Sequence, residues 1–369
     1  MRLQPLLLAV GCMLCASAFG QDTYYWQQVP VQANIANLAL PQLGINQSDQ
    51  IVGQTQGGVA FIASNGIVQT LGTFGGATSN AHAINDFGVA SGAADTGTAG
   101  SYHPYTSNGG ALNDLGTLNG GAYASSYDIN FYGDVVGQAI DGSTGQRVGY
   151  ISLGLGGAFT SLGTLAGSNT IFASTAYGVN NNDEVVGAST TSSFGSDAFS
   201  WTFGGGMVDL GTLGGSYSAA MRVNDNGDIA GYATLAGDSV TEAFLYSNGS
   251  MHEVDGPSGG GNTEGMGLNL NDQMVGLYTD PNSHTKAFIN ESGSSYDLNN
   301  LLKSSLPSGV WLAEAYAIND NGDIAAMGSD GYVYLLTTTQ PAPEPATLIG
   351  LVGFGALLLR RRKQAKTTQ

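Results

Sequence analysis

Seven copies of one short motif constrain the fold of this chain more than any other feature of its sequence. Each copy has an apolar residue, an Asn, a turn, two or three apolar residues, and a small residue seven positions after the Asn. The seven Asn residues lie 39 to 50 positions apart and are Asn46, Asn85, Asn130, Asn180, Asn224, Asn269 and Asn319. A repeat of this length predicts similar structural units that bury their apolar faces against their neighbours.

Each copy of the repeat contains four extended segments. In the clearest copy these are residues 219–224, 228–232, 242–246 and 251–254, with Asp-Asn-Gly at 225–227 as the first turn. An Asn-Gly pair between apolar runs is the strongest short hairpin signal, because both central turn positions favour a positive φ. Four antiparallel strands in about 45 residues match the size of one propeller blade.

The ends of the repeat region predict how a ring would close. Two strands fit before the first Asn and two after the last, over residues 24–31, 38–45, 323–326 and 332–336. We therefore predict an all-β, seven-bladed β-propeller of four-stranded antiparallel blades over residues 21–340, with a 2+2 strand closure. A ring leaves no long unpaired edge strand. A β-solenoid is the alternative, although its repeats are usually shorter and it needs capping units.

The repeat resembles that of HAF-type extracellular repeat proteins. The shared frame is Ala-Phe, then Leu-Gly-Thr-Leu-Gly-Gly, then Ile/Val-Asn-Asp-x-Gly-x-Ile-x-Gly, and residues 210–231 carry most of it. Residues 297–320 resemble the terminal repeat of that family. The resemblance covers most of residues 43–336 and implies an extracellular protein but no particular activity. The chain departs from the frame because no His precedes its Ala-Phe pairs and Ala326 replaces the last Gly.

The first 20 residues have the layout of a secretory signal peptide. Met1-Arg2 is a positive start, residues 6–10 are an apolar core, and Ala16-Ser17-Ala18 is a small-x-small site. Cleavage after Ala18 or after Gly20 fits this layout. A lipoprotein signal is the alternative, but the residues before Cys12 and Cys15 make a poor lipobox.

Residues 341–369 combine a small polar motif, a short apolar run and a basic end. The motif is Pro343-Glu344-Pro345, and the basic cluster consists of Arg360, Arg361, Arg362 and Lys363. The apolar run covers at most 14 residues, 346–359, whereas a stable membrane span needs about 20. We expect a short transmembrane helix that anchors the chain transiently in the inner membrane, with the basic cluster as a cytoplasmic stop-transfer signal. A permanent anchor is the alternative.

This tail resembles the PEP-CTERM sorting signal of Gram-negative bacteria. The Pro-Glu-Pro motif, the apolar segment interrupted by Gly and the terminal Arg run match in order and spacing. The resemblance implies that an exosortase-type membrane protease processes the tail and that the host makes an exopolysaccharide (biofilm) matrix. The expected location is therefore the cell surface or the extracellular matrix.

The charge of the region between the two signals excludes several partners. It holds four basic residues (Arg147, Arg222, Lys286 and Lys303) and 27 acidic ones, a net charge of −23. Such a surface repels nucleic acid and anionic lipid. Both Cys residues precede position 20, so this region has no disulfide, thiolate nucleophile or Cys metal site.

No catalytic motif stands out, and we predict a protein without enzymatic activity and without a cofactor. The four His residues are far apart and lack metal-site spacing. Two turns invite a calcium interpretation, because oxygen ligands alternate along them; the candidate ligands are Asp225, Asp228, Asp320 and Asp323. Ordinary Asn-Gly hairpins with Asx turns are the alternative, and a distal bidentate Glu is absent.

These features predict an exported, non-enzymatic repeat protein of the cell surface or exopolysaccharide matrix. A polysaccharide-binding or carbohydrate-active (glycosidase-like or lyase-like) propeller is the alternative. Carboxylates and aromatic side chains clustered on one face would favour the alternative, and a uniformly acidic face rich in Gly, Ser and Asn would favour the first.

Overall fold

The computed structural model describes residues 22–33, 43–167, 173–257 and 261–340. These ranges are all-β, apart from two short 3-10 helices, η1 (Leu118–Gly120) and η2 (Leu298–Leu301). No helix in these four ranges is long and apolar enough to cross a membrane. Several predicted features lie outside the described residues: the signal peptide with Ala18 and Gly20, Pro343-Glu344-Pro345, the C-terminal hydrophobic helix, and Arg360, Arg361, Arg362 and Lys363.

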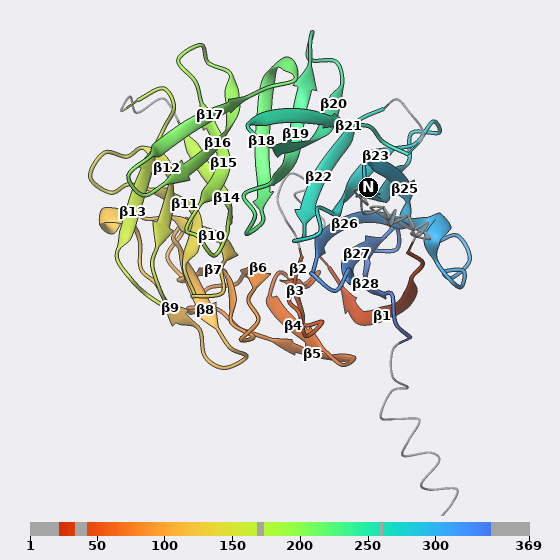
Figure 1. Ribbon diagram of the computed structural model, residues 1–369. Coiled ribbons are helices and arrows are strands. Elements are labelled where there is room, and N and C mark those ends of the chain that lie inside the picture. Colours follow the sequence, from red (N-terminus) through yellow and green to blue (C-terminus); the bar gives the residue numbers. More distant parts are fainter. Residues whose placement is uncertain (1–21, 34–42, 168–172, 258–260, 341–369) are drawn as a thin grey trace, which may run out of the picture.

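Five separate four-stranded antiparallel sheets stand around a common axis (Figure 1). The first is β2 (Gly44–Ile45), β3 (Ile51–Gln54), β4 (Ala60–Ser64) and β5 (Ile67–Thr70). The second is β6 (Ser79–Ile84), β7 (Ala90–Asp95), β8 (Tyr102–Ser107) and β9 (Asn113–Asp114). The third is β10 (Ala124–Ile129), β11 (Val135–Ile140), β12 (Arg147–Ser152) and β13 (Phe159–Gly163). The fourth is β22 (Thr263–Leu268), β23 (Met274–Thr279), β24 (Thr285–Glu291) and β25 (Ser294–Asp297).

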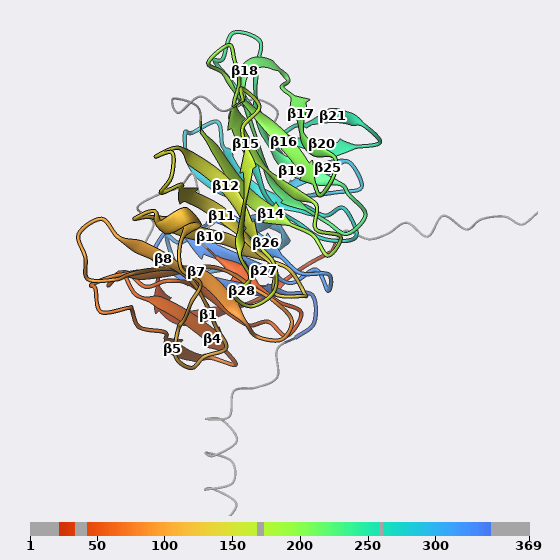
Figure 2. The same ribbon diagram turned by 90° about the vertical axis from the view of Figure 1, so that its left-hand side faces the viewer.

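The fifth sheet closes the ring by joining the two ends of the described chain. It contains β26 (Leu312–Ile318), β27 (Ile324–Gly328), β28 (Tyr332–Thr337) and β1 (Tyr25–Gln32), in the order β1-β28-β27-β26. β1 lies beside β28 in Figure 1 and in Figure 2, and the two strands pair antiparallel from Tyr25↔Thr337 onward. The prediction of an all-β propeller with four-stranded antiparallel blades is thereby confirmed.

The closure combines three C-terminal strands with one N-terminal strand, so the predicted 2+2 closure is wrong. The second N-terminal segment ends in β2, which pairs with β3 and not with the closing sheet. The physical reason is that a strand ending at an Asn forms a hairpin with the strand that follows it. Each such strand therefore begins a sheet, and only β1 is left to complete the last one.

The remaining eight strands form one sheet, so the described part of the chain has six sheets where seven separate ones were predicted. The strands are β14 (Ser174–Val179), β15 (Val185–Thr190), β16 (Ser196–Thr202), β17 (Gly206–Gly211), β18 (Gly214–Val223), β19 (Ile229–Leu235), β20 (Thr241–Ser247) and β21 (Ser250–Val254). Two antiparallel groups, β14–β17 and β18–β21, are joined by a single parallel pair, Ser196↔Tyr217. β18 and β14 are the first strands of the two groups, and β18 has 10 residues whereas β14 has 6. The additional residues at the beginning of β18 bring Tyr217 beside β16.

The Ala-Phe pairs of the third strands build the core between neighbouring sheets. Phe61, Phe199, Phe244 and Phe288 are each 0% exposed. Phe244, on β20, packs against Val186 and Ala198 of the preceding strand group. Burying a side chain of this size stabilises the fold by about 1.5–3 kcal/mol relative to leaving it exposed.

The small residue of the repeat motif is required by a close approach of two strands. A Cβ on Gly137 would lie 1.9 Å from the carbonyl oxygen of Ser125, and one on Gly187 would lie 1.9 Å from that of Thr175. The approach occurs beside a β-bulge in the first strand of each pair, for example between Ser126 and Asp128. The bulge exists because one extra residue in the first strand opposes the second strand.

The bulged residues fill the centre of the ring. They lie three positions before each Asn, and the register shifts identify His82, Tyr127, Tyr177, Met221, Met266 and Tyr316. The first strands contact one another around the axis, from β2 through β26 and back to β2. Among them, the ring of His82 lies 5.3 Å from that of Tyr127, which lies 5.7 Å from that of Tyr177. We call the space that the first strands surround the central channel.

Candidate functional site at the mouth of the central channel

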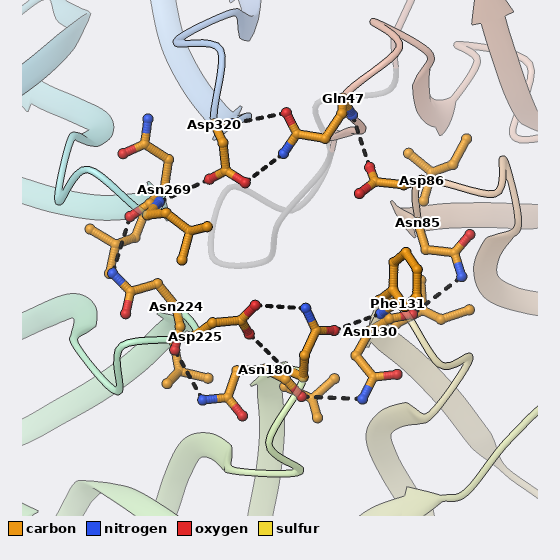
Figure 3. A pocket seen from close by; sticks show the side chains of 17 residues that line it. Gln47, Asn85, Asp86, Asn130, Phe131, Asn180, Asn224, Asp225, Asn269 and Asp320 are labelled. Carbon is orange, nitrogen blue, oxygen red and sulfur yellow. Dashed lines mark hydrogen bonds between the residues drawn. The ribbon is translucent and has the colours of Figure 1, made fainter.

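The seven Asn side chains form a closed circle of hydrogen bonds at one end of the channel. Each Nδ2 donates to the main-chain carbonyl of the next Asn, at 3.0–3.2 Å. The last donor, Asn319 Nδ2, lies 3.0 Å from Asn46 O and closes the circle. In Figure 3 these amides surround the mouth of the channel.

The same Asn side chains also hold their own turns. Asn224 Oδ1 accepts from the main-chain N–H groups of Asn226 and Asp228, both at 3.0 Å. The contact between neighbouring repeats was not predicted from the sequence. The available signal was the invariance of Asn, because Asp offers the same acceptor but no donor.

The residues that follow each Asn line the mouth. They are Gln47, Asp86, Phe131, Asn181, Asp225, Leu270 and Asp320, around a cavity of about 210 Å³. The cavity floor is apolar and consists of the residues that precede each Asn, including Ile84, Val179 and Leu268. The lining of the mouth is therefore mainly polar, with a smaller apolar part beneath.

Polar side chains of the mouth are held by neighbouring repeats. Asp225 Oδ1 accepts from the main-chain N–H of Asn181 at 2.8 Å, and its Oδ2 accepts from Asn181 Nδ2 at 2.7 Å. Asp320 accepts from the N–H of Leu270, in the preceding repeat, at 2.9 Å and from Gln47 Nε2, in the next repeat around the ring, at 2.7 Å. These bonds fix the carboxylates in place while leaving further acceptor positions on each oxygen.

The structure does not assemble the predicted calcium ligands. Asp225 and Asp320 lie in the mouth, bonded to amides, whereas the carboxyl of Asp228 faces Asp272 and that of Asp323 faces Asp49. In the described ranges no group of three or more His, Cys, Asp or Glu side chains could hold a metal ion. The four candidates therefore belong to two different structural settings.

An exposed aromatic group lies on one side of the mouth. It consists of Phe87, Phe131 and Tyr132, which are 67%, 42% and 65% exposed. The ring centroids of Phe87 and Phe131 are 4.7 Å apart, and those of Phe131 and Tyr132 are 5.4 Å apart. Phe87 follows Asp86 directly, so aromatic rings and a carboxylate share this part of the rim. The sequence did not reveal the group, because Phe87 and Phe131 are on different repeats.

Two carboxyl groups lie deeper along the channel wall, on the first strands β22 and β26. Burial, assisted by the charge of Glu314, raises the pKa of Glu264 to about 7. Burial also raises the pKa of Glu314, although a hydrogen bond from the Tyr316 hydroxyl opposes the shift. Glu264 is therefore partly protonated near neutral pH, and no sequence motif marked either residue.

The four His residues are dispersed, as their spacing suggested. His82 is buried in the channel with its ring 5.3 Å from that of Tyr127. His103 pairs with Asp114, and His284 with Asp280. The hydroxyl of Ser250 lies 2.9 Å from His252 Nε2. Each therefore has a local structural partner.

Comparisons with known proteins define the class of fold and nothing narrower. No protein-family model matches the chain, and a search of curated proteins finds no match. Among solved structures, the WD40 β-propeller domain of Doa1 is similar at 14% identity and a TM-score of 0.54, over 85% of this chain and 98% of that one. The extracellular domain of a B. thetaiotaomicron protein is similar at 12% identity and a TM-score of 0.50, over 85% of this chain and 40% of that one.

A gluconolactonase from Xanthomonas campestris is more distant, at 11% identity and a TM-score of 0.41, over 85% of this chain and 89% of that one. At these identities the likeness concerns the fold alone. The chain is thus a β-propeller, a class that includes both enzymes and proteins without enzymatic activity.

Proposed function

We propose that this chain is an exported, non-enzymatic β-propeller of the cell surface or exopolysaccharide matrix, and that it binds polysaccharide at the mouth of its central channel. The observation that carries the proposal is the aromatic group Phe87, Phe131 and Tyr132 beside the fixed carboxylates of the mouth. Aromatic rings offer flat apolar faces for the C–H face of a sugar ring. Carboxylate and amide groups bind its hydroxyls and fix its orientation.

The charge of the described chain limits the kind of polysaccharide. A surface with 27 acidic and four basic residues between the two signals repels strongly anionic polymers. We therefore infer a neutral polysaccharide, or one that carries amino groups, as the ligand class.

We also infer that the ring has seven blades, by counting β14–β17 and β18–β21 as two. Each group has its own Asn turn and its own four strands, and only one residue pair joins them. The closed circle of seven Asn side chains supports this count.

The proposal of export rests on the two terminal signals, and the fold is compatible with their removal. Tyr24 is the first residue in the core and β28 ends at Thr337. Cleavage after Ala18 or Gly20, and processing near Pro343 by an exosortase-type protease, therefore spare every strand. Intact-mass analysis of protein from the native Gram-negative host should show neither the first 18 residues nor an unmodified Arg360–Lys363 tail. Recovery of the secreted chain with that tail intact would contradict transient anchoring.

The binding proposal is tested by replacing an aromatic residue of the mouth. We expect Phe131→Ala to weaken binding of a neutral polysaccharide by at least about tenfold, because loss of one stacked aromatic contact costs about 1.4 kcal/mol or more. A glycan array with the purified protein selects the ligand, and calorimetry then measures the affinity of each variant.

The matched control is Phe194→Ala, which removes an exposed aromatic residue (74%, against 42% for Phe131) from the β15–β16 turn at the opposite end of its sheet. Binding should be unchanged in this variant. Equal losses in both variants, or no ligand on the array, would refute the mouth as a polysaccharide site. Release of sugar fragments during incubation would show an enzyme instead of a binding protein.

A further inference from the structure

The third and fourth residues after each Asn meet across the junctions between neighbouring repeats. The third residue of one repeat faces the fourth residue of the repeat before it. At three junctions both positions hold Asp, and the facing pairs are Asp134 with Asp183, Asp228 with Asp272, and Asp323 with Asp49. At two of these junctions one Asn side chain bonds both residues of the pair: Asn224 bonds Asp228 and Asp272, and Asn319 bonds Asp323 and Asp49.

Three other junctions pair a long side chain with a Gly. A Cβ on Gly88 would lie 3.0 Å from Gln50 Oε1, one on Gly227 would lie 3.6 Å from Glu184 Oε2, and one on Gly322 would lie 3.7 Å from Gln273 Oε1. A long amide or carboxylate side chain thus fills the space that a second Asp occupies elsewhere. The remaining junction has Val89 and Gly133, and there Leu155 occupies the space beside the Gly.

The backbone shows that Asp is not the easiest residue for its position. Asp49, Asp183 and Asp272 have φ values of 57°, 59° and 57°, and the four Gly residues at the same position have φ values of 74° to 86°. A positive φ is unfavourable for a residue with a Cβ and is free of strain for Gly. Asp occurs at this strained position only where another Asp faces it.

Side-chain amides hold each pair together. Asn224 Nδ2 donates to Asp272 Oδ1 at 3.0 Å, and Asn319 Nδ2 donates to Asp49 Oδ1 at 3.2 Å. At the pair of Asp134 and Asp183, Asn130 Nδ2 donates to Asp134 Oδ2 at 2.8 Å. Because the same Asn residues form the circle around the channel, the carboxyl pairs are part of the contact between repeats.

We propose that these three pairs are carboxyl–carboxylate hydrogen bonds that each share one proton, and that they make the junctions of the ring sensitive to pH. Two ionised carboxylates in such contact repel each other, so one of them retains a proton. With the proton present, the pair is a charge-assisted hydrogen bond across the junction. Without it, the same contact becomes a repulsion between repeats.

In the described ranges, the four Lys and Arg side chains have partners other than these carboxyl groups. Arg147 bonds Gln138, Arg222 bonds main-chain carbonyls, Lys286 pairs with Asp280, and Lys303 lies over the ring of Tyr25.

The other charged or titratable groups around the pairs are mostly acidic. Burial and the charges of Asp22, Glu291 and Asp323 raise the pKa of Tyr24, which places that ring and Glu291 near the third pair. His252, Glu253 and Asp255 share a cavity of about 600 Å³ with Asp272. The N–H of Gly154 donates to Asp134 Oδ1 at 2.6 Å, and that of Thr338 donates to Asp323.

The direction of the pH effect follows from the pKa values. Burial, with the charge of Asp49, raises the pKa of Asp323 to about 6, and burial is also the main cause of the raised pKa values of Asp183 and Asp228. An Asp in the unfolded chain titrates near about 3.9. The stabilisation is therefore complete below that pH and is lost as the pH rises through the folded pKa.

The test compares the full chain with Asp49→Asn/Asp183→Asn/Asp272→Asn. An Asn at these positions tolerates the positive φ and donates a hydrogen bond at every pH. We expect the melting temperature of the unmodified protein to fall by several degrees between about pH 5 and pH 7.5 at fixed ionic strength. In the triple variant the melting temperature should change much less over the same pH range. Glu264 titrates in the same range, so each variant is compared with the unmodified protein at each pH.

A second variant keeps the test decisive if the first does not fold. Asp228→Gln/Asp272→Gly converts one junction into the Gln/Gly type that the chain already uses. This variant should remove about one third of the fall in melting temperature between about pH 5 and pH 7.5. Asp86→Asn makes the same chemical change in a turn that contains no carboxyl pair, and it should retain the full pH dependence. An infrared band of protonated carboxyl at about pH 5 should decrease in the triple variant.

Two results would overturn the proposal. One is an unchanged pH dependence in both pair variants. The other is a saturable rise in melting temperature with calcium at pH 8 that the triple variant lacks, because the pairs would then bind a cation instead of a proton.

Discussion

The side-chain amide of one Asn per repeat joins local and long-range structure in this ring. Its oxygen closes the turn that follows it, and its nitrogen bonds the next repeat, as Asn180 does to the carbonyl of Asn224 at 3.0 Å. The seven Asn side chains are 3–6% exposed. A buried amide of this kind is stabilising only when both of its groups are paired.

Asn180→Asp should therefore destabilise the protein although the two side chains have the same shape. The oxygen that accepts from Asn182 and Glu184 is retained, but the donor to Asn224 O becomes a second acceptor. We expect a loss of about 3 kcal/mol at pH 7, since a buried group that loses its partner costs about 1–3 kcal/mol and a charged one costs more. Thermal or urea unfolding measures this loss.

Asn65→Asp is the control for that substitution. Asn65 lies in the exposed turn between β4 and β5, with φ of 50°, a conformation that Asp also tolerates. Its effect should stay within about 0.5 kcal/mol. Similar effects in the two variants would mean that the bond between repeats contributes little.

At the scale of the strands, β1 is the element on which the ring depends most. It forms the outer strand of a sheet whose other three strands come from the opposite end of the chain. Val29 and Val31 pack with Tyr316, Val333 and other residues of a core cluster shared with β3 and β4. Trp26 packs against Tyr334 with ring centroids 5.9 Å apart.

Deleting residues 21–33 should leave β28 with an unpaired edge and expose that cluster. We expect aggregation, or unfolding at a lower temperature with reduced cooperativity, because an exposed hydrophobic edge strand pairs with other chains. Differential scanning calorimetry and analytical ultracentrifugation would detect both effects. Removing residues 341–369 deletes no described strand and should not reproduce them; a β1 deletion that melts like the intact ring would refute closure by this strand.

The strands themselves were largely predictable, but the way they combine was less so. Local signals such as Asn-Gly turns and Ala-Phe pairs mark where β20 and β21 begin, because hairpins depend on neighbouring residues. The sequence does not state which sheet a strand joins, so the closure by β1 alone was missed. The parallel contact of Tyr217 with Ser196 was missed for the same reason.

The candidate site was less predictable than the fold. Phe87, Phe131 and Tyr132 carry no shared motif, and they meet only because two repeats lie side by side in the ring. Likewise, Asp228 and Asp272 look like ordinary turn residues until the junction brings them together. A repeat sequence predicts its own unit well, whereas contacts between units depend on a register that is set in three dimensions.

For the whole molecule, the mouth of the channel differs in chemistry from the first strands that surround the channel. One end has the Asn circle, the fixed carboxylates of the mouth and the exposed aromatic group. Farther along the channel, β22 and β26 carry Glu264 and Glu314, which burial holds at raised pKa values. A ligand at the mouth would meet carboxylates already held by hydrogen bonds, so binding there requires little rearrangement.

The pairing of β1 with β28 also sets the order of events when the chain folds. The hydrogen bond from Gln28 to Tyr334 spans 306 positions, and such distant contacts form late because a long loop must close first. A chain that leaves the cell from its first residue to its last would have β1 outside long before β28 arrives. The ring would be completed only by the last strand, and until then the first strand would need protection from other chains.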